Sequence, residues 1–464
     1  MGGKGLERYI VLFMPWLIAF LFKGDAYLSY MIAWIGSFVI LFLTLTGWVR
    51  AMPKDRPLGE QLMRPMFIMH IIFAGYTCCT SIFYFFSVLG YDEFNAPIST
   101  FLVDQEKLEL TAQCQRLYCL GHAAFITGVL MFMKYPTKHK YYIEKSNLAS
   151  LLMKIAIISF PLSNILIRLP GLSQFSIQLS ALSFIAGTLA LAFAIPLKKP
   201  VNTLICSGLY VINFYIALTS GFKEPIIISV LVLGIFLYPN YKKLVLVTFV
   251  PILFGLFIVL PAYVNNYRST AWTGDVAADD AAQQSLDAAL NDENTTTWAF
   301  LVLRLSEIDM FTTFVKTTPS SVDYYGTELL KQSAIAIVPR IFWPEKPITE
   351  ELVMARVYKA GVVNRGSNVS AKPAYIVDGY LSAGTFGVFL SMFLYGVIAQ
   401  LISNKAEALF GGYILGTALI FSGLFQIFWR GLSFEFIINS VFWSYISMLG
   451  VFHILRKRNI LKKT

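Results

Sequence analysis

The hydrophobic residues of this chain gather into long windows that charged clusters separate. A bilayer core about 30 Å thick needs roughly 20 apolar residues to be crossed as a helix. Twelve windows of suitable length occur, near 8–22, 29–49, 66–89, 115–133, 148–168, 176–197, 201–219, 225–240, 244–264, 382–402, 411–428 and 436–454. The pattern predicts about twelve transmembrane helices.

The composition and the spacing of polar residues favour helices over a barrel. The chain is 56% hydrophobic and 14% charged, which is more apolar surface than a soluble domain of 464 residues buries. Backbone groups in hydrocarbon must be paired, and the windows lack the ten-residue alternation of an outer-membrane barrel. The predicted fold class is therefore an all-α polytopic membrane protein.

Lysine and arginine are distributed unevenly over the connections. Because positive residues in short loops stay in the cytoplasm, the bias predicts that both termini are cytoplasmic. The net charge of +10 is then mainly an orientation signal, and nucleic-acid binding is not expected, since the basic clusters are split among short juxtamembrane segments. The rich set comprises Lys4, Arg8, Arg50, Lys54, Arg56, Arg64, Lys134, Lys138, Lys140, Lys145, Lys198, Lys199, Lys242, Lys243, Lys405, Arg456, Lys457, Arg458, Lys462 and Lys463.

The cysteines and the first apolar window bear on processing and metal binding. All five cysteines fall within or at the ends of predicted spans, without the spacing of metal ligands. We expect them to be packing residues, with no disulfide and no bound metal. No small-residue cleavage site follows the first window, so it is expected to remain as a span.

One connection is much longer than the others and divides the chain. Residues 265–381 separate an N-terminal bundle of about nine helices, 1–264, from about three C-terminal helices and a basic tail, 382–464. A structureless loop of this length is uncommon, so it is expected to be partly helical and functional. The charge bias places it outside, in the periplasm if the membrane is the inner membrane of a bacterium.

The large loop changes character along its length. Residues 275–293 are rich in Ala, Asp and Gln, which favours a mobile or weakly helical surface element. Residues 298–314 and 328–342 carry apolar side chains at helical spacing, which predicts amphipathic helices on the outer leaflet. Trp343, Pro344 and Pro347 end the second helix and turn the chain back toward the membrane.

Basic residues at the outer face are the first candidates for chemistry. Each one alone is more often an interfacial anchor, but their common placement opposes the usual charge bias. Guanidinium groups bind phosphate bidentately, so the set favours a lipid-linked phosphate or pyrophosphate. No P-loop or Gly-rich dinucleotide motif is present, so no nucleotide cofactor is expected. The set is Arg116, Arg168, Lys223, Arg268, Arg304, Arg340, Lys346, Arg365 and Arg430.

An acid or base in the loop would have to be a carboxylate. None of the four histidines, His70, His122, His139 and His453, lies in residues 265–381. The candidates are Glu307, Asp309, Glu345 and Asp378, although most exposed carboxylates are merely solvated.

Three short motifs resemble one family. Residues 338–347 read Val-Pro-Arg-Ile-Phe-Trp-Pro-Glu-Lys-Pro, and this Pro-Arg-x-x-Trp-Pro-x-Lys-Pro pattern resembles the Wzy-type O-antigen and oligosaccharide-repeat-unit polymerases of bacteria. Residues 220–223, Ser-Gly-Phe-Lys, resemble the family's Ser-Gly-x-Arg turn with Lys in place of Arg. Asp378, Gly379 and Tyr380 are similar to the acidic entry to the next span, where Glu is more usual.

The resemblance implies a GT-C-like glycosyltransferase of the bacterial inner membrane that needs no metal or cofactor. It would polymerise undecaprenyl-pyrophosphate-linked oligosaccharides at the periplasmic face, with a chain-length regulator and other polysaccharide-assembly proteins as candidate partners. Arg340 would stabilise the leaving pyrophosphate, and Glu307, Asp309 or Asp378 would orient or deprotonate the acceptor hydroxyl. The implied pyrophosphate-binding set is Arg340, Lys346, Arg268, Arg304 and Lys223, with Arg168, Arg365 and Arg430 as further outer-face cations.

Other functions remain open at this point. An O-antigen ligase would use the same donor, but that family relies on a periplasmic histidine, which the large loop lacks. A flippase or transporter of lipid-linked sugars would place charges along a path through the spans, whereas charge here collects at one face. A catalytically silent partner of a polysaccharide assembly is the remaining alternative.

Overall fold

The computed structural model describes residues 5, 7–92, 95–98, 100–169, 171–271, 276–291, 295–305, 307–366, 370–426 and 431–464. Nearly all of the regular secondary structure in these residues is helical. Its only sheet pairs two short antiparallel strands, β1 (Tyr141–Tyr142) and β2 (Lys462–Lys463). The structure is that of a helical, multi-pass membrane protein.

The helices follow one another with short connections up to the large loop. The first half contains α1 (Glu7–Ile10), η1 (Val11–Phe13), α2 (Met14–Leu21), α3 (Ala26–Leu45), α4 (Leu58–Gln61), α5 (Pro65–Ile71), η2 (Ile72–Cys79), α6 (Ser81–Val88), α7 (Gln105–Phe132), α8 (Lys145–Leu166), α9 (Ser173–Ala194), α10 (Pro200–Leu218), α11 (Lys223–Leu237) and α12 (Lys242–Ala271).

The second half contains the loop helices and the last spans. These are α13 (Ala278–Asn291), α14 (Thr295–Phe300), η3 (Leu301–Leu305), α15 (Ile308–Thr317), α16 (Glu328–Ile337), α17 (Thr349–Lys359), α18 (Tyr375–Phe410), α19 (Tyr413–Phe421), η4 (Ser422–Gln426) and α21 (Phe434–Lys457). Two helices cross the limits expected for the loop, because α12 continues to Ala271 and α18 already begins at Tyr375.

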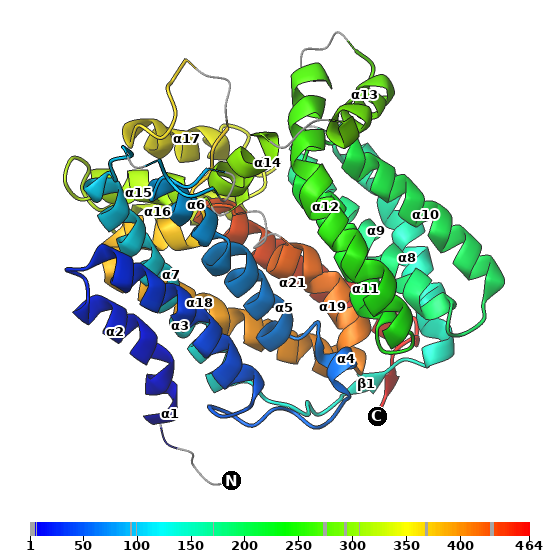
Figure 1. Ribbon diagram of the computed structural model, residues 1–464. Helices are drawn as coiled ribbons and strands as arrows, with labels where there is room; N and C mark the ends of the chain where they lie inside the picture. The colour runs from blue at the N-terminus through cyan, green and yellow to red at the C-terminus, as the bar shows by residue number, and fades with distance from the viewer. Residues whose placement is uncertain are drawn as a thin grey trace.

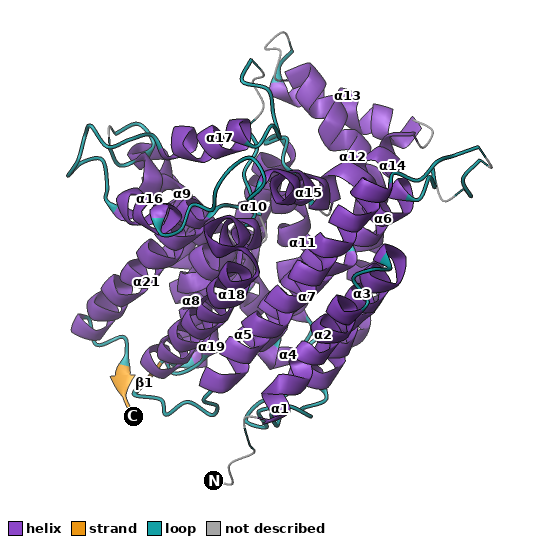
Figure 2. Cartoon of the chain, turned by 90° about the vertical axis from the view of Figure 1, so that its left-hand side faces the viewer, coloured by secondary structure: helices purple, strands orange, loops and turns teal. Residues whose placement is uncertain are grey.

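The bundle has two distinct ends (Figure 1). Both termini, α4 and the strand pair lie at one end, which we call the terminal end. Helices α13 to α17 lie at the opposite end, the loop end, where α15, α16 and α17 are again seen together in Figure 2. Residues 265–381 therefore form a helical cap over one end of the bundle.

The number of spans differs from the twelve expected. In the described chain, seven helices are long and apolar enough to cross a bilayer, and α12, bent by 44°, makes an eighth if it is one span. The seven are Ala26–Leu45, Pro65–Val88, Asn147–Leu166, Phe175–Ala194, Pro200–Leu218, Tyr375–Phe410 and Phe434–Lys457.

Length and polarity explain the other four windows. Window 8–22 is divided among α1, η1 and α2, and windows 225–240 and 411–428 correspond to the shorter apolar helices Glu224–Leu237 and Ile414–Phe425. Window 115–133 lies in α7, which is long, but Gln115, Arg116 and His122 lower its hydropathy. A sequence window does not show where a helix breaks, so the twelve windows exceed the number of helices that are long and apolar enough to cross.

A close crossing of α7 and α18 forms the centre of the bundle. A Cβ added at Gly396 would lie 2.1 Å from the carbonyl oxygen of Phe125, and one at Gly128 would lie 2.3 Å from that of Phe393. Small residues allow such backbone contact between membrane helices. The crossing holds α7 and α18 side by side, and they contribute Tyr118, from the middle of α7, and Tyr375, from the start of α18, to the site described next.

Candidate functional site

Glu307 holds an unusual position at the loop end. It lies between η3 and α15 with φ +55°, a left-handed conformation that non-glycine residues seldom adopt. Tyr76 donates a hydrogen bond to its Oε1 over 3.3 Å. Gly431 lies so close that a Cβ there would be 2.4 Å from Glu307 Oε2. Backbone strain of this kind clusters at functional sites, which makes Glu307 the best placed of the predicted carboxylates.

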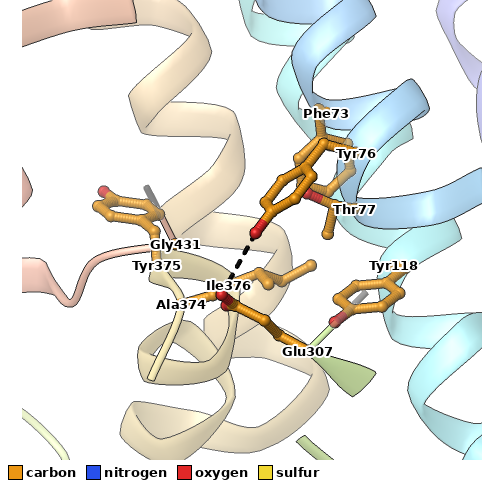
Figure 3. Close-up of a pocket in the computed structure, with 9 residues that line it drawn as sticks. All are labelled: Phe73, Tyr76, Thr77, Tyr118, Glu307, Ala374, Tyr375, Ile376 and Gly431. Atoms are coloured by element: carbon orange, nitrogen blue, oxygen red, sulfur yellow. Dashed lines mark hydrogen bonds between the residues drawn. The ribbon is translucent and has the colours of Figure 1, made fainter. Parts of the chain in front are cut away.

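The carboxylate of Glu307 faces a small cavity with aromatic walls (Figure 3). Tyr76 comes from η2, Tyr118 from α7 and Tyr375 from the start of α18. The centre of a water molecule can reach only about 20 Å³ of it, which is room for one water and not for a sugar. The other lining residues are Phe73, Thr77, Ala374, Ile376 and Gly431.

One π-helical segment lines this cavity, and two others end close in sequence to residues that line it. The first, η2, contains the lining residues Phe73, Tyr76 and Thr77, and η3 ends at Leu305, two residues before Glu307. The third, η4, ends at Gln426, shortly before Gly431 in the chain. Single π turns inside helices are rare and occur frequently at functional sites. The π-helical segment η2 in its wall, together with the conformation of Glu307, marks this cavity as the candidate site.

A buried ion cluster lies behind the cavity wall. Arg356 of α17 makes two hydrogen bonds of 2.8 Å to the carboxylate of Glu435 in α21 and one of 2.9 Å to Oδ2 of Asp378 in α18. The same Oδ2 accepts the backbone N–H of Phe434 over 2.8 Å. Since the Phe434 ring packs on Tyr375 at 4.5 Å, the cluster supports one wall of the cavity.

The electrostatics of the cluster follow from its burial. The exposed fraction is 2% for Arg356 and 0% for Asp378 and Glu435. Burial acts to lower the pKa of the Arg356 guanidinium, but the two carboxylates outweigh it and hold that pKa above its usual value. Asp378 does not line the cavity, and its described contacts tie helices together. Its catalytic role stays a prediction.

Asp309 points to a different neighbour. Its Oδ1 accepts a hydrogen bond of 2.7 Å from the hydroxyl of Tyr84 in α6, and the Lys107 ammonium lies 5.2 Å from the Tyr84 ring centre. Asp309 is one turn removed from the cavity and is half-buried. Its predicted role in catalysis also stays a prediction.

The motif around Arg340 closes on itself. The guanidinium of Arg340 donates to the carbonyl oxygens of Pro344 and Pro347, each over 3.2 Å. Lys346 is buried and donates to Ala336 at 3.1 Å and Val338 at 2.8 Å, at the end of α16. Burial, and then the charge of Arg340, lower the pKa of the Lys346 ammonium. Both cations therefore donate hydrogen bonds to backbone carbonyls, either of this turn or of the end of α16.

The turn at 220–223 meets another predicted cation. Arg268 Nε donates to the Gly221 carbonyl over 2.8 Å, and its guanidinium lies 5.4 Å from the Phe222 ring centre. The structure thus brings Arg268 to the Ser-Gly-Phe-Lys motif. Arg168 and Arg365 are exposed at the surface and do not line the cavity. The side chains of Lys223 and Arg304, and the whole of Arg430, lie outside the described residues.

Several residues of the site were not found from the sequence. Tyr76 and Tyr118 lie inside apolar windows and Tyr375 lies near the end of the large loop, and a tyrosine gives no distinct signal in either place. Arg356 and Glu435 were not among the candidates from the sequence. Their pairing joins positions 79 residues apart, and only the packing of α17 on α18 and α21 brings them together.

Possible metal ligands do not cluster in the described part of the chain. No group of three or more His, Cys, Asp or Glu side chains that could hold a metal ion occurs among the described residues. All five cysteines are free, and all but Cys79 are buried. These cysteines pack within the bundle.

Fold and site together define a polytopic helical membrane protein with a small cavity, lined by a half-buried carboxylate, at the helical cap. The chain belongs to the family DUF8712, described as a domain of unknown function, whose model matches residues 14–463. No curated protein and no solved structure matches the chain.

Proposed function

We propose that this protein is a membrane glycosyltransferase that polymerises lipid-pyrophosphate-linked oligosaccharides at the loop end of its bundle. The observation that carries the proposal is the Glu307 cavity: a carboxylate on a left-handed backbone, among three tyrosines, with the π-helical segment η2 in the cavity wall. In this proposal the membrane is the inner membrane of a bacterium, the loop end is periplasmic and both termini are cytoplasmic. The positive residues at the terminal end support that orientation.

A GT-C-like arrangement with twelve crossings belongs to the same proposal. The ends of α7 support it: Lys107 lies by Tyr84 near the loop end, and the Phe132 carbonyl accepts from Asn404 near the terminal end. Helix α11 likewise runs from the Ser-Gly-Phe-Lys turn to Tyr238, which approaches Gly59 beside α4. In this proposal, the segment from α1 to α2 and the segment of α19 and η4 are the two further crossings.

The reaction assigns distinct work to Glu307 and the cations. The acceptor hydroxyl oxygen bonds to the anomeric carbon of the donor chain as the bond from that carbon to the pyrophosphate oxygen breaks. Glu307 takes the hydroxyl proton and later releases it to solvent, while Tyr76 holds its carboxylate in place. The pyrophosphate leaves with the electron pair and is stabilised by arginines, with Arg268 and Arg340 as the described candidates.

The size of the cavity sets a requirement on this mechanism. About 20 Å³ admits a water but no sugar, so the acceptor enters only when a wall moves. Gly431, whose φ is +59°, and Ala374, at the start of α18, are wall positions that a shift of the cap would open. Lid movement of this kind is common in enzymes that exclude water from the reaction.

The decisive test compares two carboxylates of the cap. A deletion strain is complemented with Glu307→Gln or with Glu345→Gln, which changes an exposed residue, and lipid-linked glycans are separated on a gel. We expect single repeats from Glu307→Gln and full ladders from Glu345→Gln, at equal protein levels. Full ladders from Glu307→Gln would overturn the assigned role of Glu307.

The deletion strain itself separates the functions. Loss of a polymerase leaves single lipid-linked repeats, loss of a ligase leaves long lipid-linked chains, and loss of a flippase leaves repeats on the cytoplasmic face. Arg340→Ala is expected to abolish the polymer and leave the single repeat. Long chains in that strain would remove Arg340 from the pyrophosphate site.

A further inference from the structure

The turn between α16 and α17 presents apolar side chains to its surroundings. The exposed fraction is 53% for Ile341, 78% for Phe342 and 40% for Trp343. These residues are consecutive, and Ile348 beyond them is also exposed, at 48%. Isolated apolar residues are normal at a surface, but such a run indicates contact with another apolar phase.

The turn is built to hold these side chains outward. Arg340 bonds Pro344 and Pro347, and the buried Lys346 bonds carbonyls on the other side of the turn. Exposed apolar residues thus stand on a backbone that two cations fix from within. A rigid turn loses little conformational entropy when its side chains insert.

The position of the turn along the bundle follows from Trp443. Its Nε1 donates to the carbonyl of Ile337, the last residue of α16, over 2.9 Å. Trp443 lies nine residues after Phe434, where α21 begins, which is about 13 Å along the helix. The ring of Phe175, the first residue of the apolar span Phe175–Ala194, packs on Trp443 at 4.8 Å. The turn is therefore level with the end of a membrane span.

The connection between α8 and α9 touches the turn directly. Gly171, with φ +78°, lies so close that a Cβ would be 2.9 Å from the backbone nitrogen of Ile341. Ile167 and Leu169 of this connection are exposed by 61% and 43%, and the neighbouring Arg168 is exposed as well. The apolar surface of the turn is thus continuous with the outer end of two spans, and cations stand beside it.

We propose that residues 341–343 insert into the lipid bilayer at the loop end and anchor the cap to the membrane surface. An aromatic side chain, aliphatic neighbours and flanking cations are the combination that favours the boundary between headgroups and acyl chains. Phe342 and Ile341 enter the acyl region, Trp343 lies at the boundary, and Arg168 faces the phosphate groups. This inference does not depend on the proposed enzymatic activity.

A depth measurement on the full chain in phospholipid nanodiscs tests the insertion. Phe342→Cys is labelled with an environment-sensitive fluorophore and compared with Glu345→Cys in the same turn and Asp323→Cys on another exposed loop. The unaltered chain corrects for labelling of native cysteines. The label at 342 is expected to emit at shorter wavelength, to lose fluorescence with acyl-chain nitroxide lipids and to resist aqueous iodide.

The controls give the contrast that decides the question. The label at 323 should respond to iodide only, and the label at 345 should respond to headgroup nitroxides more than to acyl-chain nitroxides. Iodide quenching at 342 equal to that at 323 would overturn the proposal. Protection from iodide without quenching by any lipid nitroxide would overturn it too, because a protein partner or a second copy would then cover the turn. No glycan is present, so failure of the polymerase proposal leaves this result unchanged.

Discussion

The two ends of the bundle each hold a buried arginine between two carboxylates, but the surroundings differ. At the loop end, Arg356 binds Asp378 and Glu435, and none of the three side chains is more than 2% exposed. At the terminal end, Arg64 binds Glu407 at 2.9 Å and Asp55 at 2.6 Å, and Asp55 is 13% exposed. A second cation, Arg56, lies 3.5 Å from Glu407.

The difference concerns charge balance. The terminal cluster has as many guanidinium groups as carboxylates, access to water, and the Tyr135 ring 3.7 Å from Arg64. The loop cluster has one guanidinium for two carboxylates, and Asp378 Oδ1 accepts no hydrogen bond from the described residues. An imbalance of this kind is costly to bury. The cluster is connected with the Glu307 cavity through Phe434, which donates its backbone N–H to Asp378 and packs its ring on Tyr375.

The largest effect is expected from Arg356→Met. It leaves two carboxylates in a dry interior without their cation, which costs about 3–5 kcal/mol of unfolding free energy. Thermal unfolding of the purified protein in detergent measures the loss. The triple variant Arg356→Met, Asp378→Asn, Glu435→Gln removes the charges together and should regain most of the stability. A single variant that unfolds like the unaltered protein would end the comparison.

Arg64→Met should lower the free energy of unfolding by less, about 1–3 kcal/mol. The two carboxylates at this end keep other hydrogen-bond partners when Arg64 is removed. Glu407 retains Arg56, and Asp55 can bind water. Unfolding under the same conditions as for Arg356→Met gives the two values side by side. Equal losses would mean that the balance of charges does not distinguish the two ends.

How far the sequence predicts this molecule differs between fold and site. The apolar windows predicted the helices well, because a helix that crosses a bilayer needs a long, nearly uninterrupted run of apolar residues. The positions of helix breaks could not be predicted in this way, as the division of window 8–22 into α1, η1 and α2 illustrates. Glu307 was one of four candidate carboxylates from the sequence, because the loop contains no histidine. Its strained backbone and its tyrosine neighbours come from η2, α7 and α18, whose convergence is a tertiary property.

The Pro-Arg-x-x-Trp-Pro motif illustrates the same limit at residue scale. The prolines predicted the end of a helix after Phe342, whereas α16 already ends at Ile337 and a turn follows it. The cations were assigned to phosphate from their type alone. The directions of Arg340 and Lys346 depend on carbonyl groups that only the folded turn brings within reach.

Acid should affect the terminal cluster through Asp55. The hydrogen bonds from Arg64, opposed by burial, hold the pKa of the Asp55 carboxyl below its usual value. The unfolded chain then binds this proton at higher pH than the folded chain, so Asp55 contributes stability above about pH 4 that is lost as pH falls through its folded pKa. Asp55→Asn should flatten the fall in unfolding temperature over that range. An unchanged slope would contradict the assignment to Asp55.

The smallest effect on stability is expected for a solvent-exposed ion pair at the terminal end. Lys462 binds Glu144 at 2.5 Å, but their exposed fractions are 54% and 48%, so water screens the pair. The tail is also held by backbone: β1 pairs with β2, and Thr464 N donates to the Lys140 carbonyl over 3.2 Å. Glu144→Gln should therefore leave the unfolding temperature unchanged, both at low and at high salt. If it lowered stability as much as Arg64→Met, exposure would not govern the worth of these ion pairs, and the contrast between the two ends would need another cause.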